Sequence, residues 1–212
     1  MTNEKQSLQN NNNAVTGSAI KKRNHKVQLV TEAMARPENK KVPVNSVPID
    51  KTLANVGFQK PKRKVTQCFI HCSADSNPKN DDVSVMARWH LQRGFTEVGY
   101  HYFIKKDGTL QEGRNIEETP AAQNEFKTIN GIKIGGNTNT IAICLHGGGG
   151  NPPINDFTQE QYKTLKNLCK SINEAYNSKI TFHGHCEVSS KACPVFDYKT
   201  VLKLDKNGKL GI

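Results

Sequence analysis

The sequence predicts an α/β domain, built as a mixed central β-sheet flanked by helices, behind a basic and largely irregular N-terminal extension. Two short apolar runs, Cys68–Ser73 and Thr140–Leu145, are typical of strands buried inside a sheet. Residues 158–176 carry apolar side chains at helical spacing, which predicts a helix packed on that sheet. The extension is indicated by charge, because nearly all of the net charge of +11 lies in the first third of the chain.

The extension and the domain are expected to divide at residue 64. Residues 1–64 hold 13 Lys or Arg against 4 Asp or Glu, whereas residues 65–212 hold 17 against 15. High charge with few apolar residues favours a segment that is flexible or becomes ordered on a partner. Such a concentrated positive charge predicts an anionic partner, for which a wall polymer, a virion protein and a nucleic acid are equally suitable.

The first elements of the domain follow in order from residue 68. Side chains alternate along a strand, so His71 lies on the face of strand 68–73 opposite to the two cysteines of that strand. An Asp-Asp pair can cap a helix over residues 81–93. Residues 98–105 and 109–114 read as strands, and the Asp-Gly pair between them is a strong hairpin signal.

The second half of the domain alternates between irregular and regular segments. Residues 115–139 are rich in Gly and Asn and are expected to be irregular, whereas the apolar run at 140–145 predicts a central strand. Thr158 and Gln161 form a capping box at the start of the long helix. A last strand is expected at residues 180–183, directly before the segment that carries most of the chemistry.

Residues 183–194 concentrate metal-binding side chains in one loop. Zinc accepts imidazole nitrogen and thiolate sulfur, and a catalytic zinc site keeps one position open. His185 and Cys193 are far enough apart for a chain reversal to bring both to one ion. A third ligand must come from elsewhere, and His71 at the end of a buried strand is the best candidate.

These residues also have ordinary interpretations. A single histidine beside a strand is more often a hydrogen-bonded structural residue, and a single cysteine is more often a small buried apolar side chain. His183 and Cys186 are rival ligands close to His185. The spacing matches neither zinc fingers nor zinc deaminases, so the residues by themselves make a zinc site plausible without deciding it.

Four motifs decide more than the spacing does. Together they make the chain resemble, over residues 65–204, the zinc-dependent N-acetylmuramoyl-L-alanine amidases of the phage T7 lysozyme type, which are relatives of the peptidoglycan recognition proteins. The motifs are Phe69-Ile-His-Cys-Ser-Ala74, Val98-Gly-Tyr-His-Tyr-Phe-Ile104 with Lys106-Asp-Gly108, Asn139-Thr-Ile-Ala-Ile-Cys-Leu145, and His185 with Lys191-Ala-Cys-Pro194.

The resemblance implies an activity and a set of site residues. His71, His185 and Cys193 would hold Zn²⁺, and zinc-activated water would hydrolyse the amide between N-acetylmuramic acid and L-alanine in peptidoglycan. Lys191 matches the lysine that hydrolysis needs, and its ammonium can stabilise a developing oxyanion. Tyr100 matches the catalytic tyrosine, which could orient water or pass a proton to the leaving amine.

The chain departs from the resemblance at two places. Where relatives often have a histidine before the Gly/Asn-rich loop, this sequence reads Thr119-Pro-Ala-Ala122, so a contact on the substrate side is missing or supplied differently. The loop at residues 123–136 is also longer than in compact relatives, which could alter the groove. Neither departure touches the implied metal ligands.

Two other functions compete with a lytic enzyme. One is a peptidoglycan-binding module that does not cut, and the presence of Cys193 with Tyr100 and Lys191 argues against it. The other is a virion or nucleic-acid-binding protein that acts through its basic N-terminal arm. No apolar run reaches the roughly 18 residues of a membrane span, and no secretory signal is visible. We therefore expect a monomeric phage endolysin in the host cytoplasm before lysis, with a virion-associated lysin as the alternative.

Overall fold

A computed structural model describes residues 46–47, 58–129 and 131–211. The expected extension at residues 1–64 therefore lies outside the described residues, apart from residues 46–47 and 58–64. The latter contact the domain: the Arg63 guanidinium donates to the carbonyls of Ile116 at 2.6 Å and Thr140 at 2.8 Å. The Phe58 ring packs 6.3 Å from the ring of Tyr176.

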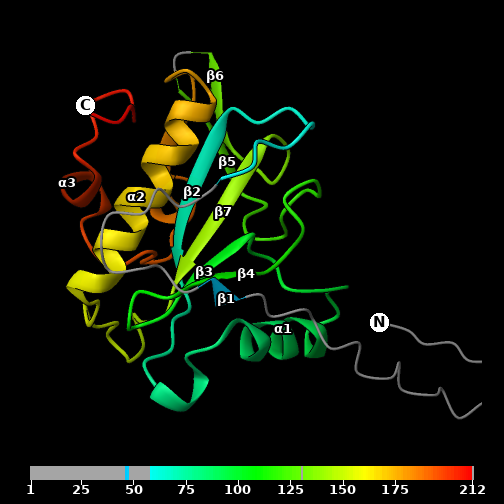
Figure 1. Ribbon diagram of the computed structural model, residues 1–212, viewed down its shortest axis with the longest axis vertical. Coiled ribbons are helices and arrows are strands. Elements are labelled where there is room, and N and C mark those ends of the chain that lie inside the picture. Colours follow the sequence, from blue (N-terminus) through cyan, green and yellow to red (C-terminus); the bar gives the residue numbers. More distant parts are fainter. Residues whose placement is uncertain (1–45, 48–57, 130, 212) are drawn as a thin grey trace, which may run out of the picture. The chain divides into compact units, whose positions relative to one another are not determined.

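The predicted mixed sheet is confirmed and has six strands in the order β1-β4-β3-β7-β2-β8 (Figure 1). The four strands β3, β7, β2 and β8 run parallel to one another, whereas β4 is antiparallel to both β1 and β3. The strand bounds are β1 Ser46–Val47, β2 Gln67–Cys72, β3 Tyr102–Ile104, β4 Leu110–Glu112, β7 Thr140–Leu145 and β8 Thr181–Gly184.

Three α-helices of the described residues flank this sheet, and the first two begin where the sequence predicted. The side chain of Asp82 caps α1 (Val83–Gln92), and the capping box of Thr158 with Gln161 opens α2 (Gln159–Ala175). The short α3 spans Tyr198–Leu202. Two 3₁₀ turns, Pro78–Asn80 and His185–Glu187, complete the helical elements of the described part of the chain.

The helices divide the core between the two faces of the sheet. On one face, α2 and α3 pack against β2, β3 and β7 in a large apolar cluster that contains Ile70, Ile143 and Leu168. On the other face, α1 packs in a smaller cluster that contains Phe103 and Cys144. The smaller cluster covers only part of its face, and His71 lies on the remaining part, on β2 beside Cys144 of β7.

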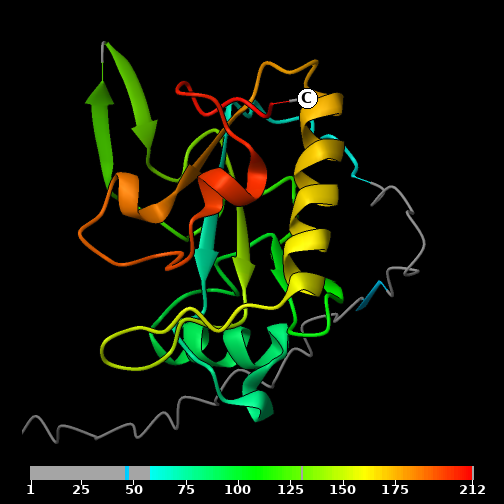
Figure 2. The same cartoon turned by 90° about the vertical axis from the view of Figure 1, so that its left-hand side faces the viewer.

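The segment at residues 115–139 is not irregular throughout, so this expectation was wrong in part. It contains an antiparallel hairpin of β5 (Phe126–Ile129) and β6 (Ile132–Gly135). The sequence held the signal, because an Asn-Gly dipeptide between two alternating runs is typical of a two-residue hairpin turn. The hairpin lies on the side of the sheet opposite to α2 (Figure 2).

Candidate metal centre

The topology of the sheet brings distant parts of the chain to one edge. Strand β2 lies between β7 and β8 and runs parallel to both. His71 is the penultimate residue of β2, and His185 directly follows the end of β8. Their side chains therefore meet at the carboxyl ends of parallel strands, where open α/β sheets bind their ligands.

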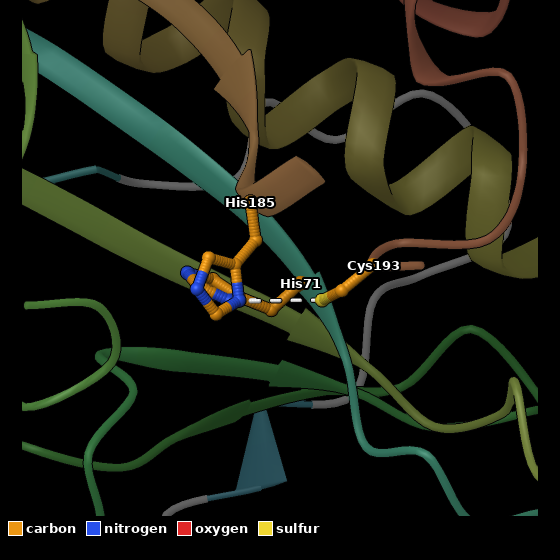
Figure 3. Close-up of side chains that lie close together, drawn as sticks. All are labelled: His71, His185 and Cys193. Carbon is orange, nitrogen blue, oxygen red and sulfur yellow. Dashed lines mark hydrogen bonds between the residues drawn. The ribbon is translucent and has the colours of Figure 1, made fainter. Parts of the chain in front are cut away.

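Three side chains that could bind a metal ion converge at this edge (Figure 3). The ligand atoms of His71, His185 and Cys193 all lie within 4.8 Å of one another. The Nδ1 atom of His71 is 3.8 Å from the sulfur of Cys193, and the two imidazole rings are 4.8 Å apart. All three residues are buried, with exposures of 1%, 5% and 8% in that order. The described residues thus form a compact cluster that could hold a metal ion.

The electrostatics of the cluster favour neutral imidazoles. Burial and the nearby His185 lower the pKa of His71 to about 3. Burial also lowers the pKa of His185, although Glu125 opposes that shift. Both rings therefore keep a lone pair for a cation at neutral pH, because only the unprotonated ring can bind a metal.

The thiol of the cluster is also shaped by its surroundings. A hydrogen bond with the Cys72 side chain and burial raise the pKa of Cys193 well above its usual value. The backbone N–H of Cys72 points at the Cys193 sulfur from 3.3 Å. A bound cation would favour the thiolate and offset the cost of burying it. Two imidazole nitrogens and one thiolate are a donor set that suits zinc.

Each histidine of the cluster has a partner on its Nε2 atom. His71 Nε2 lies 3.0 Å from the side-chain oxygen of Gln123, and His185 Nε2 lies 3.5 Å from the carboxylate of Glu125. Sequence reasoning missed both partners. They lie 52 and 60 residues away from the histidines that they contact, and only the fold brings them there.

Tyr100 lies beside the cluster, in the segment before β3 and not inside a strand as expected. Its ring centroid is 5.3 Å from that of His71 and 5.4 Å from that of His90. Burial, followed by the thiols of Cys144 and Cys193, raises the pKa of Tyr100 well above its usual value. The hydroxyl thus stays protonated at neutral pH and can donate a hydrogen bond.

Lys191 lies at the rim of the cluster. Its side chain is 68% exposed, and its ammonium is 3.9 Å from the carboxylate of Glu125. The same carboxylate accepts a hydrogen bond from the Ser189 hydroxyl at 3.4 Å. Glu125 therefore joins the loop that carries Lys191 to the hairpin side of the site.

The comparisons with known proteins identify the family. The profile of the N-acetylmuramoyl-L-alanine amidase family matches residues 61–196. The chain belongs to this family. The endolysin of Klebsiella phage KP32 is 34% identical over 69% of this chain and 91% of its own length. The endolysin of Escherichia phage T7 is 35% identical over 69% and 91%. The solved amidase LysC of Clostridium intestinale is 26% identical over 66% of this chain and 85% of its own, with a TM-score of 0.50.

The amidase is accordingly a peptidoglycan hydrolase, as the motifs implied. Among the described residues, the histidines outside the cluster have partners of their own. Both nitrogens of His183 are occupied, by Glu187 at 2.7 Å and by the hydroxyl of Thr181 at 2.8 Å. His101 Nδ1 accepts from the backbone N–H of Ala142 at 3.0 Å.

The two rival ligands lie outside the cluster. The amidase brings neither His183 nor Cys186 into the cluster, and Cys186 is exposed. His90 Nδ1 accepts from the backbone N–H of Gly99 at 2.8 Å, so this ring supports the segment before Tyr100. Among the described residues, no helix combines the length and the apolar content needed to span a bilayer.

Proposed function

We propose that this amidase is a phage endolysin that uses one zinc ion, bound by His71, His185 and Cys193. The observation that carries the proposal is the buried cluster of two imidazoles and one thiol in a chain of this family. The endolysins of phages KP32 and T7 support a role in host lysis, with action on the wall from the host cytoplasm.

The chemistry divides between the ion and the side chains around it. A zinc ion held there supplies Lewis-acid chemistry and makes water nucleophilic near neutral pH. The exposed ammonium of Lys191 is assigned the role of stabilising the negative charge that develops on the oxygen of the scissile carbonyl. The protonated hydroxyl of Tyr100 can donate to a reacting oxygen or to the leaving amine. The products are the lactyl carboxylate of the sugar and the free amino group of L-alanine.

A binding module without catalysis is the competing function, and the donor set argues against it. Binding of a stem peptide alone needs neither a buried thiol nor a lysine at the rim. Here the Cys193 sulfur and the Tyr100 ring both lie beside His71, and Lys191 is linked to the site through Glu125. A hydrolase needs this combination, whereas a recognition surface does not.

The partner of the basic segment at residues 1–64 stays a prediction, as does the monomeric state. Its excess of 13 Lys or Arg over 4 Asp or Glu suits an anionic polymer. Binding of that kind weakens steeply with salt. Retention of the full chain on isolated walls at increasing salt would test it.

The proposed function is tested by zinc content and by amine release from peptidoglycan, with Cys193→Ser and Cys186→Ser in parallel. Both substitutions remove one thiol from the same loop, but Cys186 is exposed and lies outside the cluster. We expect one zinc per chain and new L-alanine amino termini for the parent and for Cys186→Ser, with both lost in Cys193→Ser. Full activity of Cys193→Ser, or a parent without zinc, would refute the ligand set. Zinc without amine release would indicate a binding module.

A further inference from the structure

The two metal-site histidines owe their orientation to one short segment of the chain. We infer that Gln123 and Glu125 are positioning residues, which fix the proton of each histidine on Nε2 and leave Nδ1 for the ion. The inference rests on the proposed zinc site, because it concerns two of its three ligands. It assigns a role to the loop that departs most from compact relatives.

The buried amide of Gln123 determines the tautomer of His71. Its NH₂ group donates to the carbonyl of Gly136 at 3.2 Å and lies 3.4 Å from the hydroxyl of Thr140. The amide oxygen is therefore the atom that faces His71 Nε2, at 3.0 Å, and it can only accept. Nε2 must then carry the proton, and the lone pair is on Nδ1, which faces Cys193.

Glu125 acts on His185 in the same way but through a charge. Because an ionised carboxylate can only accept hydrogen bonds, the proton between the two groups lies on His185 Nε2 and Glu125 is the acceptor. It lies 3.5 Å from His185 Nε2 and 3.9 Å from the Lys191 ammonium. The Glu125 carboxylate thus contacts both His185, whose ring it orients, and the ammonium of Lys191.

The β5–β6 hairpin anchors both partners to the sheet. The amide of Gln67, at the start of β2, accepts from the backbone N–H of Gly135 at 3.0 Å and donates to the carbonyl of Lys133 at 2.7 Å. The backbone N–H of Gly136 donates to the Glu125 carbonyl at 2.8 Å. Gln67 thus ties β6 to the strand that carries His71, and the bond between Gly136 and Glu125 holds the start of the hairpin to its end.

The two partners differ in exposure, and this difference predicts unequal effects. Gln123 is 2% exposed, so water cannot replace its amide oxygen. The Glu125 side chain is 42% exposed, so water can take over part of its role. Partners of metal-bound histidines typically change metal affinity by about 10–100-fold when they are removed. We expect Gln123 to lie at the upper end of that range and Glu125 at the lower end.

Zinc affinity by chelator competition is the first test, with four variants of the full chain. Gln123→Leu and Glu125→Ala remove the acceptor, whereas Gln123→Glu keeps one. Glu174→Gln removes an exposed negative charge on α2 and serves as the control. We expect losses of about 100-fold and 10-fold for the first two, less than 3-fold for Gln123→Glu, and no change for the control. Wild-type affinity in folded Gln123→Leu would overturn the inference.

Nitrogen NMR of the imidazoles in the metal-free protein is the second test, and it needs neither zinc nor activity. We expect both His71 and His185 to carry their proton on Nε2 at pH 7.5. A proton on Nδ1 of either ring would overturn the inference even if Gln123→Leu failed to fold. A parent that binds no zinc but has both Nε2 protons would instead refute the ligand set and leave the tautomer assignment standing.

Discussion

The face of the sheet that packs on α2 and the face that carries His71 are built from alternate residues of the same strands. On the α2 face, Ile70 and Ile143 pack with Leu168 in a closed apolar layer. On the opposite face, α1 covers only one part, and the histidines of the candidate metal centre occupy another. The α2 face therefore supplies most of the hydrophobic stabilisation. This stabilisation offsets the free-energy cost of burying polar groups on the opposite face.

This division makes predictions of two kinds. Substitutions on the site face should change turnover more than stability, and substitutions on the α2 face should do the reverse.

Tyr100→Phe is expected to have the largest effect on turnover. It removes one hydroxyl but keeps the ring that packs against His71. Loss of a proton donor typically costs about 10²–10⁴-fold in rate, so we expect kcat to fall within that range while zinc content is unchanged. Steady-state release of L-alanine amino termini measures it. A kcat equal to that of the parent would show that the Tyr100 hydroxyl has no role in the reaction.

Lys191→Met is expected to lower kcat by about 10²–10³-fold, the usual loss for one group that stabilises an oxyanion. The side chain is 68% exposed, so its removal should leave thermal stability within experimental error. Lys170→Met on α2, also 68% exposed, is the matched control and should keep full activity. An equal loss in both variants would mean that general charge, not position, matters.

Leu168→Ala tests the α2 face. Leu168 is fully buried there, so we expect the free energy of unfolding to fall by about 2–5 kcal/mol. Leu91→Ala, at a 44% exposed position, should change it by less than about 0.5 kcal/mol. Chemical denaturation measures both. The kcat of folded, zinc-loaded Leu168→Ala should equal that of the parent, and a tenfold decrease would show that the faces are coupled.

The smallest expected effect is a loss of folding stability at acidic pH, to which two buried histidines outside the cluster contribute. Burial lowers the pKa of His90 to about 4 and that of His101 to about 3. The unfolded chain has ordinary histidines with a pKa near 6.5, so it binds protons first as the pH falls. The stability that the two neutral rings contribute is present above pH 6.5 and is lost as the pH falls. At pH 5.5 the loss should be about 1 kcal/mol for each histidine.

Denaturation of the metal-free protein at several pH values measures this loss together with that of His71 and His185, whose lowered pKa values act in the same direction. His101→Gln should make the dependence between pH 6.5 and pH 5 shallower. A parent whose stability does not change over that range would contradict the neutral, buried state of both rings.

The predictability of the molecule also differs between its regions. The strands at 68–73 and 140–145 could be read from the sequence because burial on both faces requires an unbroken apolar run. The family motifs then indicated His71, His185 and Cys193. Polar residues in a Gly- and Asn-rich segment carry no such pattern, so the roles of Gln123 and Glu125 appear only when the fold brings them to the histidines.

X-ray absorption at the zinc edge most directly tests the proposed binding of one zinc ion by His71, His185 and Cys193. We predict one sulfur neighbour at about 2.3 Å and two imidazole nitrogens at about 2.0–2.1 Å, with a lighter fourth ligand. The sulfur should vanish from the spectrum of any zinc that Cys193→Ser retains. A parental site without sulfur, or with two sulfur atoms because Cys72 also binds, would contradict this ligand set.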